Sequence, residues 1–215
     1  MQRLIAVLLG VILTGCGPSP PERIQGPVPS QIDDGASALA RGDDRAAFSA
    51  FERSAQAGNV EAQVWLARLY SRGQGVPQNH AEAASWYRRA AEQGSAEGQS
   101  QLGAAYSIGR GVPQNYPEAF QWLKLAAEQN DASAQFNLAS MYYLGRGVQK
   151  DYVQALKWFN ITAARHTSST FRYMALSMAT DVASMMSSAQ IREAHDLAAR
   201  WKPTRSGSNS LVGSP

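Results

Sequence analysis

The sequence holds a single cysteine, Cys16, so no disulfide can form within the chain. It also has no block of like charge: 20 Lys and Arg residues against 17 Asp and Glu residues give a formal net charge of +3. Spread over 215 residues, this charge is a weak field without the basic patch that marks a nucleic-acid-binding protein. We therefore expect no nucleic-acid partner.

Long hydrophobic runs are missing as well. The longest apolar stretch covers residues 4–13 and follows the positively charged Arg3. A membrane-spanning helix needs roughly 20 apolar residues, and a shorter stretch behind a positive charge is typical of a signal peptide. We expect residues 1–15 to be a signal peptide that is removed on export.

Motifs for catalysis, metal binding and nucleotide binding are not found. The three histidines, His80, His166 and His195, do not have the spacing of metal ligands. His195 and Asp196 are adjacent on an expected helix, where neighbouring side chains point about 100° apart, so an exposed helix face explains them better than a catalytic pair. The Gly-x-Gly turns lack the third glycine or the Lys-Ser/Thr of a phosphate loop. We expect no enzymatic activity, no metal site and no cofactor.

What the sequence does contain is a motif that returns every 36 residues. Five of its positions recur in three copies: Gly75-Val76, Gly111-Val112 and Gly147-Val148; Trp86, Trp122 and Trp158; Leu66, Leu102 and Leu138; Tyr70, Tyr106 and Tyr142. A fixed period of this length indicates a solenoid, in which each unit buries its apolar face only against its neighbours. Such a scaffold presents a surface, which favours a binding function.

Each copy is expected to form two helices. In residues 61–94 the apolar residues of the first half follow the spacing of one helical face, and glycines end that helix after Arg72. Asn79 is the expected N-cap of the second helix, with Glu82 completing a capping box. The later copies offer Asn115 with Glu118, and Asp151 with Gln154. Small residues at the helix crossing, Ala67, Gly103 and Ala139, allow close packing, and each Trp is expected to fill the groove to the next hairpin.

The pattern Leu-(Ala/Gly)-x-x-Tyr-x-x-Gly-x-Gly-Val, followed by Ala-x-x-Trp-x-x-x-Ala-Ala, resembles the Sel1-like repeat, a relative of the tetratricopeptide repeat. The resemblance implies an all-α fold, a right-handed superhelical solenoid of antiparallel helix hairpins over residues 31–203. Its expected parts are a degenerate first hairpin (31–59), full repeats (60–94, 96–130 and 132–165) and a C-terminal capping hairpin (169–203). Asn130 departs from the repeat, because glycine stands at positions 58 and 94.

The four residues Leu13-Thr14-Gly15-Cys16 resemble the bacterial lipoprotein box, in which the cysteine is lipidated. A free cysteine behind an ordinary signal peptide is the alternative. Lipidation at Cys16 would leave no thiol for a metal site or a nucleophile, and Gly17 in place of Asp favours the outer membrane. The resemblance thus implies a lipid anchor at the periplasmic face of the outer membrane of a Gram-negative bacterium. Residues 16–30 are expected to be a Pro-rich tether, and residues 204–215 a disordered tail.

In tetratricopeptide-like solenoids the first helix of each hairpin lines the concave face. Positions opposite the buried stripe should point into that groove and contact a protein partner: Val64, Arg68, Arg72, Ser100, Ala104, Ile108, Phe136, Ser140, Tyr143 and Leu144. They vary between copies while the framework does not, although ordinary solvent-facing variation would look the same. Aromatic and Arg side chains on such a face are typical binding hot spots. A methionine cluster, in contrast, follows a core stripe: Met174, Met178, Met185 and Met186.

The resemblance leaves several functions open. One is a periplasmic immunity protein that neutralises a phospholipase effector delivered by type VI secretion. Another is a scaffold for envelope assembly or polysaccharide export. A third is β-lactam binding or hydrolysis, known for cysteine-rich Sel1-like relatives, but this chain lacks their disulfides. The sequence does not indicate an oligomeric state.

Overall fold

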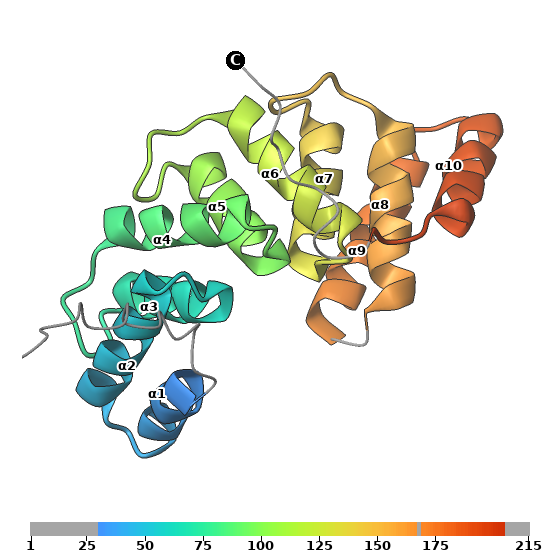
Figure 1. The fold of residues 1–215 in the computed structure, drawn as a ribbon. Helices are drawn as coiled ribbons and strands as arrows, with labels where there is room; N and C mark the ends of the chain where they lie inside the picture. Colours follow the sequence, from blue (N-terminus) through green and yellow to red (C-terminus); the bar gives the residue numbers. More distant parts are fainter. Residues whose placement is uncertain (1–29, 167–168, 205–215) are drawn as a thin grey trace, which may run out of the picture.

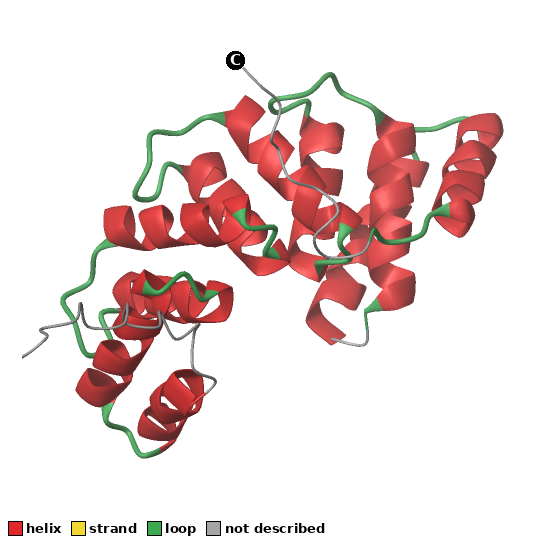
Figure 2. Ribbon diagram, in the orientation of Figure 1, coloured by secondary structure: helices red, strands yellow, loops and turns green. Residues whose placement is uncertain are grey.

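The computed structural model describes residues 30–166 and 169–204, and within these ranges it is built of helices without strands (Figure 2). The all-α expectation is confirmed. The elements are α1 (Ser30–Ala40), α2 (Asp44–Gln56), α3 (Val60–Arg72), α4 (His80–Glu92), α5 (Ala96–Ile108), α6 (Tyr116–Glu128), α7 (Ala132–Leu144), α8 (Tyr152–Arg165), α9 (Ser169–Ala183) and α10 (Ser188–Arg200).

Several features expected from the sequence fall on residues outside these ranges. The signal peptide, the lipidation site at Cys16, the tether up to residue 29 and the tail from residue 205 all lie outside the described residues. Helix α1 begins at Ser30, the last residue of the expected tether.

Each helix from α1 to α8 packs against the next one, and Figure 1 shows the chain following an arc from α1 to α10. The repeated apolar positions form the core. Leu66, Leu102 and Leu138 are completely buried, and the three repeated tryptophans are nearly so. The helices therefore form a continuous solenoid of hairpins, as the 36-residue period predicts.

The helix starts follow the predicted capping pattern. Asn79, Asn115 and Asp151 are the N-caps of α4, α6 and α8, and each side chain accepts a hydrogen bond from the backbone N–H three residues on. Among the described helices, the complete reciprocal capping box is found at Ser187 and Gln190, where α10 starts. At the turn before α7, Asn130 adopts a left-handed φ of 73°, which explains how it replaces the glycines at 58 and 94.

The Gly-x-Gly loops do more than end helices. The first glycine, Gly109 in the second copy, is the left-handed C-cap of α5, with φ 70°. The second, Gly111, also has a left-handed φ, and a Cβ placed there would collide with the backbone carbonyl of His80 at the start of α4. Gly75 and Gly147 meet the carbonyls of Asp44 and Tyr116 in the same way. Each loop therefore rests on the backbone of the preceding hairpin, and only glycine leaves room for that contact.

A ladder of buried glutamines joins successive hairpins. Gln63, Gln99 and Gln135 occupy one repeat position and are at most 3% exposed. The amide of Gln99 donates to the carbonyl oxygen of Ala91 at 3.1 Å, and its Oε1 accepts from Gln129 Nε2 at 2.8 Å. The other two members donate to Ala55 and Ala127. Because a buried amide without partners is costly, these bonds fix the position of each hairpin against the previous one.

His166 completes the ladder in the third repeat. Gln135 gives its amide protons to Ala127 and Asn130, so its Oε1 accepts, and Nε2–H of His166 donates to it at 2.9 Å. Burial lowers the pKa of the His166 ring, with the charge of Asp131 acting in the opposite direction. The histidine that matched no site motif thus has a structural role in its neutral form.

The C-terminal end differs from the expected capping hairpin of residues 169–203. Helices α9 and α10 both pack on α8, and α10 lies against α8 rather than pairing with α9. Trp201, just after α10, contacts Trp158 edge to face at 5.6 Å between ring centroids. The methionine expectation is wrong in part, because Met174 and Met185 are exposed while Met178 and Met186 are half-buried against the core. With α10 on α8, one side of α9 is left open to solvent.

The glycine contacts predict different costs for two similar substitutions. Gly109→Ala forces alanine into a left-handed conformation and should destabilise the fold by about 1–2 kcal/mol. Gly111→Ala has the same strain plus the collision with His80, and should cost roughly 1–3 kcal/mol more. Urea unfolding followed by circular dichroism measures both. Equal losses would show that the contact between hairpins does not require glycine.

Burial of His166 predicts that the stability of the fold depends on pH. Because the pKa of His166 is lower in the folded chain than the ordinary 6.5, the unfolded chain binds this proton more tightly. Its contribution to stability is complete above about pH 6.5 and is lost as the pH falls through the folded pKa. His166→Gln should reduce this loss, because an amide takes up no proton and therefore places no charge in the partly buried site.

The measurement is the unfolding free energy at about pH 7.5 and pH 5.5. His195→Gln, which changes an exposed histidine on α10, should behave like the parent chain. If His166→Gln loses as much stability on acidification as the parent, burial of the His166 ring is not the source of the acid sensitivity.

Candidate functional site

Three hollows lie along the helices that begin the hairpins. Hollow 1 lies between α3 and the start of α5 and has a volume of about 740 Å³. Its walls include Val64, Trp65, Arg68 and Glu97. The Arg68 guanidinium lies 4.5 Å from the centroid of the Trp65 ring and forms an ion pair with Glu97. This arginine is therefore already paired inside the protein.

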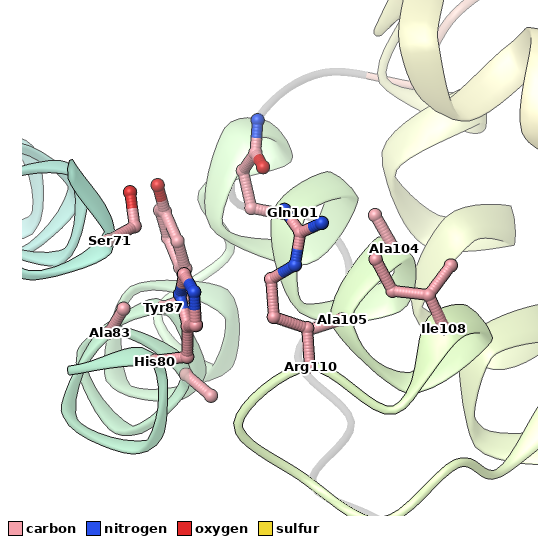
Figure 3. Close-up of a pocket in the computed structure, with 10 residues that line it drawn as sticks. Ser71, His80, Ala83, Tyr87, Gln101, Ala104, Ala105, Ile108 and Arg110 are labelled. Atoms are coloured by element: carbon pink, nitrogen blue, oxygen red, sulfur yellow. The ribbon is translucent and has the colours of Figure 1, made fainter. Parts of the chain in front are cut away.

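Hollow 2 lies between α4 and α5 and encloses about 110 Å³ (Figure 3). In that view, His80 and Tyr87 stand on one side, Ala104 and Ile108 on the other, and the Arg110 side chain rises between them. The remaining walls are Ser71, Ala83, Ala84, Gln101 and Ala105. Burial raises the pKa of the Tyr87 phenol, so this wall of the hollow stays neutral.

Hollow 3, of about 240 Å³, is formed in the same way one repeat further on. Seven of its lining residues stand 36 positions after residues of hollow 2: Ser107, Tyr116, Asn137, Ser140, Met141, Leu144 and Arg146. Ala104 and Ile108 of α5 line both hollows. Hollows 2 and 3 are therefore neighbouring copies of one site on a continuous surface.

The middle hairpin differs from its neighbours at one aromatic position. At the equivalent positions in the neighbouring hairpins, Phe48 and Phe120 pack edge to face on Tyr70 and Tyr142, in each case at 5.4 Å between ring centroids. Ala84 holds this position in the middle hairpin and lines hollow 2. The middle hairpin therefore lacks the aromatic pair that its neighbours have at this position.

The charges around hollows 2 and 3 have one sign. Arg110 and Arg146 are each the central residue of a Gly-Arg-Gly loop, and no Asp or Glu lines either hollow. Within residues 30–166 and 169–204, the Arg68–Glu97 contact is the one ion pair found, so neither loop arginine has an acidic partner there. Arg146 lies over the Tyr116 ring at 5.5 Å. The two hollows combine apolar walls with an available guanidinium.

The structure brings six of the predicted groove residues to these hollows: Val64 and Arg68 to hollow 1, Ala104 and Ile108 to hollows 2 and 3, Ser140 and Leu144 to hollow 3. Arg72 is exposed but lines none of them. Ile108 and Leu144, 58% and 46% exposed, are among the most accessible large apolar side chains of the described chain.

Other members were expected to face water and do not. Val64 and Ser100 are buried, and the Ser100 hydroxyl donates to Asp131, whose carboxyl pKa is raised by burial. Phe136 packs on Phe159 and Phe171, and Tyr143 lies 5.9 Å from Tyr152. Phe136 and Tyr143 are thus half-buried through packing with neighbouring aromatic rings.

Sequence reasoning missed most of the other lining residues, among them four that carry a ring or a charge: His80, Arg110, Tyr116 and Arg146. The signal was present in the period, because Arg110 and Arg146 stand 36 residues apart, as do His80 and Tyr116. These positions lie in the loop and at the start of the second helix, whereas the predicted groove was confined to the first helix.

Two negative findings hold for the described residues alone. No helix there is long and apolar enough to span a bilayer. No group of three or more His, Cys, Asp or Glu side chains there is arranged to bind a metal ion.

Comparisons with known proteins agree in finding Sel1 repeats. The sequence model of the Sel1 repeat matches residues 60–95, 96–131 and 132–165. A Sel1 repeat protein from Oxalobacter formigenes is 37% identical over 61% of this chain and 95% of that one, with a TM-score of 0.54. A protective antigen of uropathogenic Escherichia coli with an SLR fold is 27% identical over 80% of this chain, with a TM-score of 0.55. The match covers 44% of that antigen. No curated protein matches the chain.

Proposed function

Because the chain belongs to the Sel1 repeat family, whose members are generally protein-interaction modules, we propose that it is a lipid-anchored periplasmic protein that binds a protein partner through hollows 2 and 3. One observation carries the proposal. The framework repeats from hairpin to hairpin, whereas several wall positions of the hollows change: His80 becomes Tyr116, and Gln101 becomes Asn137. Side chains that the fold leaves free to differ are the ones available for recognition.

The proposed location at the membrane rests on the N-terminal sequence. A short apolar stretch leads directly to Leu13-Thr14-Gly15-Cys16, which resembles a lipoprotein box. A lipid on Cys16 would hold the solenoid near the membrane, with the Pro-rich residues as a spacer. Gly17 supports the outer membrane as the destination.

The anchor predicts a change in fractionation. The parent chain should sediment with membranes and incorporate labelled palmitate, whereas Cys16→Ser should do neither. An exported Cys16→Ser chain that stays in the membrane pellet, or a parent chain without label, would contradict lipidation at this residue.

Partner binding is tested by affinity capture from envelope extracts with mass spectrometry. Ile108→Ser combined with Leu144→Ser removes the exposed apolar walls of hollows 2 and 3 without touching the buried core. We expect this double variant to lose the captured protein. Tyr173→Ser combined with Leu176→Ser is the matched control, because it removes comparable exposed apolar area from α9.

Loss of the partner in the α9 control instead would place the binding surface there. Absence of any protein that the parent chain enriches specifically would contradict the interaction role. The partner's identity also separates the roles that the resemblance implies. A type VI phospholipase effector would make the chain an immunity protein, and a component of envelope assembly or polysaccharide export would make it a scaffold.

A further inference from the structure

We propose that hollows 2 and 3 bind one extended acidic segment of the partner, with carboxylates paired to Arg110 and Arg146 and aliphatic side chains placed against Ile108 and Leu144. The inference rests on the proposed function and specifies the chemistry of its partner. It concerns a surface that continues from α4 across α5 to α7.

Charge is the first argument. Arg110 and Arg146 belong to exposed loops, and in the described part of the chain neither has an acidic partner. No Asp or Glu lines either hollow. A guanidinium at the rim of an apolar hollow binds a carboxylate in a bidentate geometry and repels a basic segment. Hollow 1 is different, because Glu97 already pairs with its Arg68.

Apolar surface is the second argument. Ile108 and Leu144 hold the same repeat position at the C-terminal ends of α5 and α7, and both are exposed. A bound aliphatic side chain would cover apolar area that now faces water.

Spacing is the third argument. Helices α5 and α7 contact one another, and axes of contacting helices lie about 10 Å apart. An extended peptide advances about 3.3 Å per residue. Equivalent points of hollows 2 and 3 therefore match residues about three apart on the ligand. A segment in which one acidic and one aliphatic residue recur every three residues would contact both hollows in the same way.

The test uses the full chain, purified from membranes in a mild detergent, and a fluorescent decapeptide of sequence Ser-Leu-Glu-Ser-Leu-Glu-Ser-Leu-Glu-Ser. Fluorescence anisotropy measures its Kd. A second peptide has Gln at each Glu position, and a third has Lys. We expect the acidic peptide to bind about tenfold more tightly than the Gln peptide, and the Lys peptide to bind least.

Two variants locate the binding. Arg110→Glu combined with Arg146→Glu should weaken binding of the acidic peptide about tenfold or more. Arg192→Glu combined with Arg200→Glu makes the same charge change on exposed residues of α10 and should leave the Kd within about twofold.

Equal binding of the acidic and Gln peptides would overturn the inference, as would equal effects of the two double charge reversals. So would a dimer in sedimentation experiments that dissociates on Arg110→Glu and Arg146→Glu, because a second copy would then occupy the surface. If these peptides fail but Ile108→Ser with Leu144→Ser still abolishes capture, the proposed function stands and only the acidic chemistry is wrong.

Discussion

Three buried glutamines fix how each hairpin sits on the one before it. In a solenoid each hairpin contacts mainly its neighbours, so its position must be fixed by the contacts at that junction. Apolar packing alone tolerates small slides, whereas a fully buried amide must meet its partners or lose several hydrogen bonds. Gln99 shows how this works, because one side chain joins the end of α4, the start of α5 and the end of α6. Position between hairpins is thereby specified by directional bonds.

Repetition of that step explains the site. Once successive hairpins take equivalent positions, residues 36 apart are presented on the same surface in the same orientation. His80 and Tyr116, Ile108 and Leu144, and Arg110 and Arg146 thus line two related hollows. Neither hollow depends on a unique loop or insertion. The differences between them, such as histidine at 80 against tyrosine at 116, come from single substitutions within a constant frame.

The sequence was sufficient for the framework because its determinants are local. Periodic leucines, capping residues such as Asn115 and the glycines at helix ends act within a few residues, and three copies reinforce each other. The candidate site was predicted less well. Phe136 and Tyr143 looked exposed on a helical wheel, but aromatic residues of α8 and α9 cover them, and no local pattern shows which neighbour will arrive. The packing of α10 on α8 was also not predictable, because the period ends before it.

The contact between Gly111 and α4 involves the carbonyl of His80 and not its side chain, and the same holds at Asp44 and Tyr116. An aspartate, a histidine and a tyrosine consequently occupy one repeat position without disturbing the loop that rests on it. Mutation there can alter what a hollow recognises at little cost to folding. Duplicated hairpins of this type can diverge in specificity one residue at a time, while the backbone contact keeps every intermediate folded. The architecture is therefore well suited to a protein under selection to follow a changing partner.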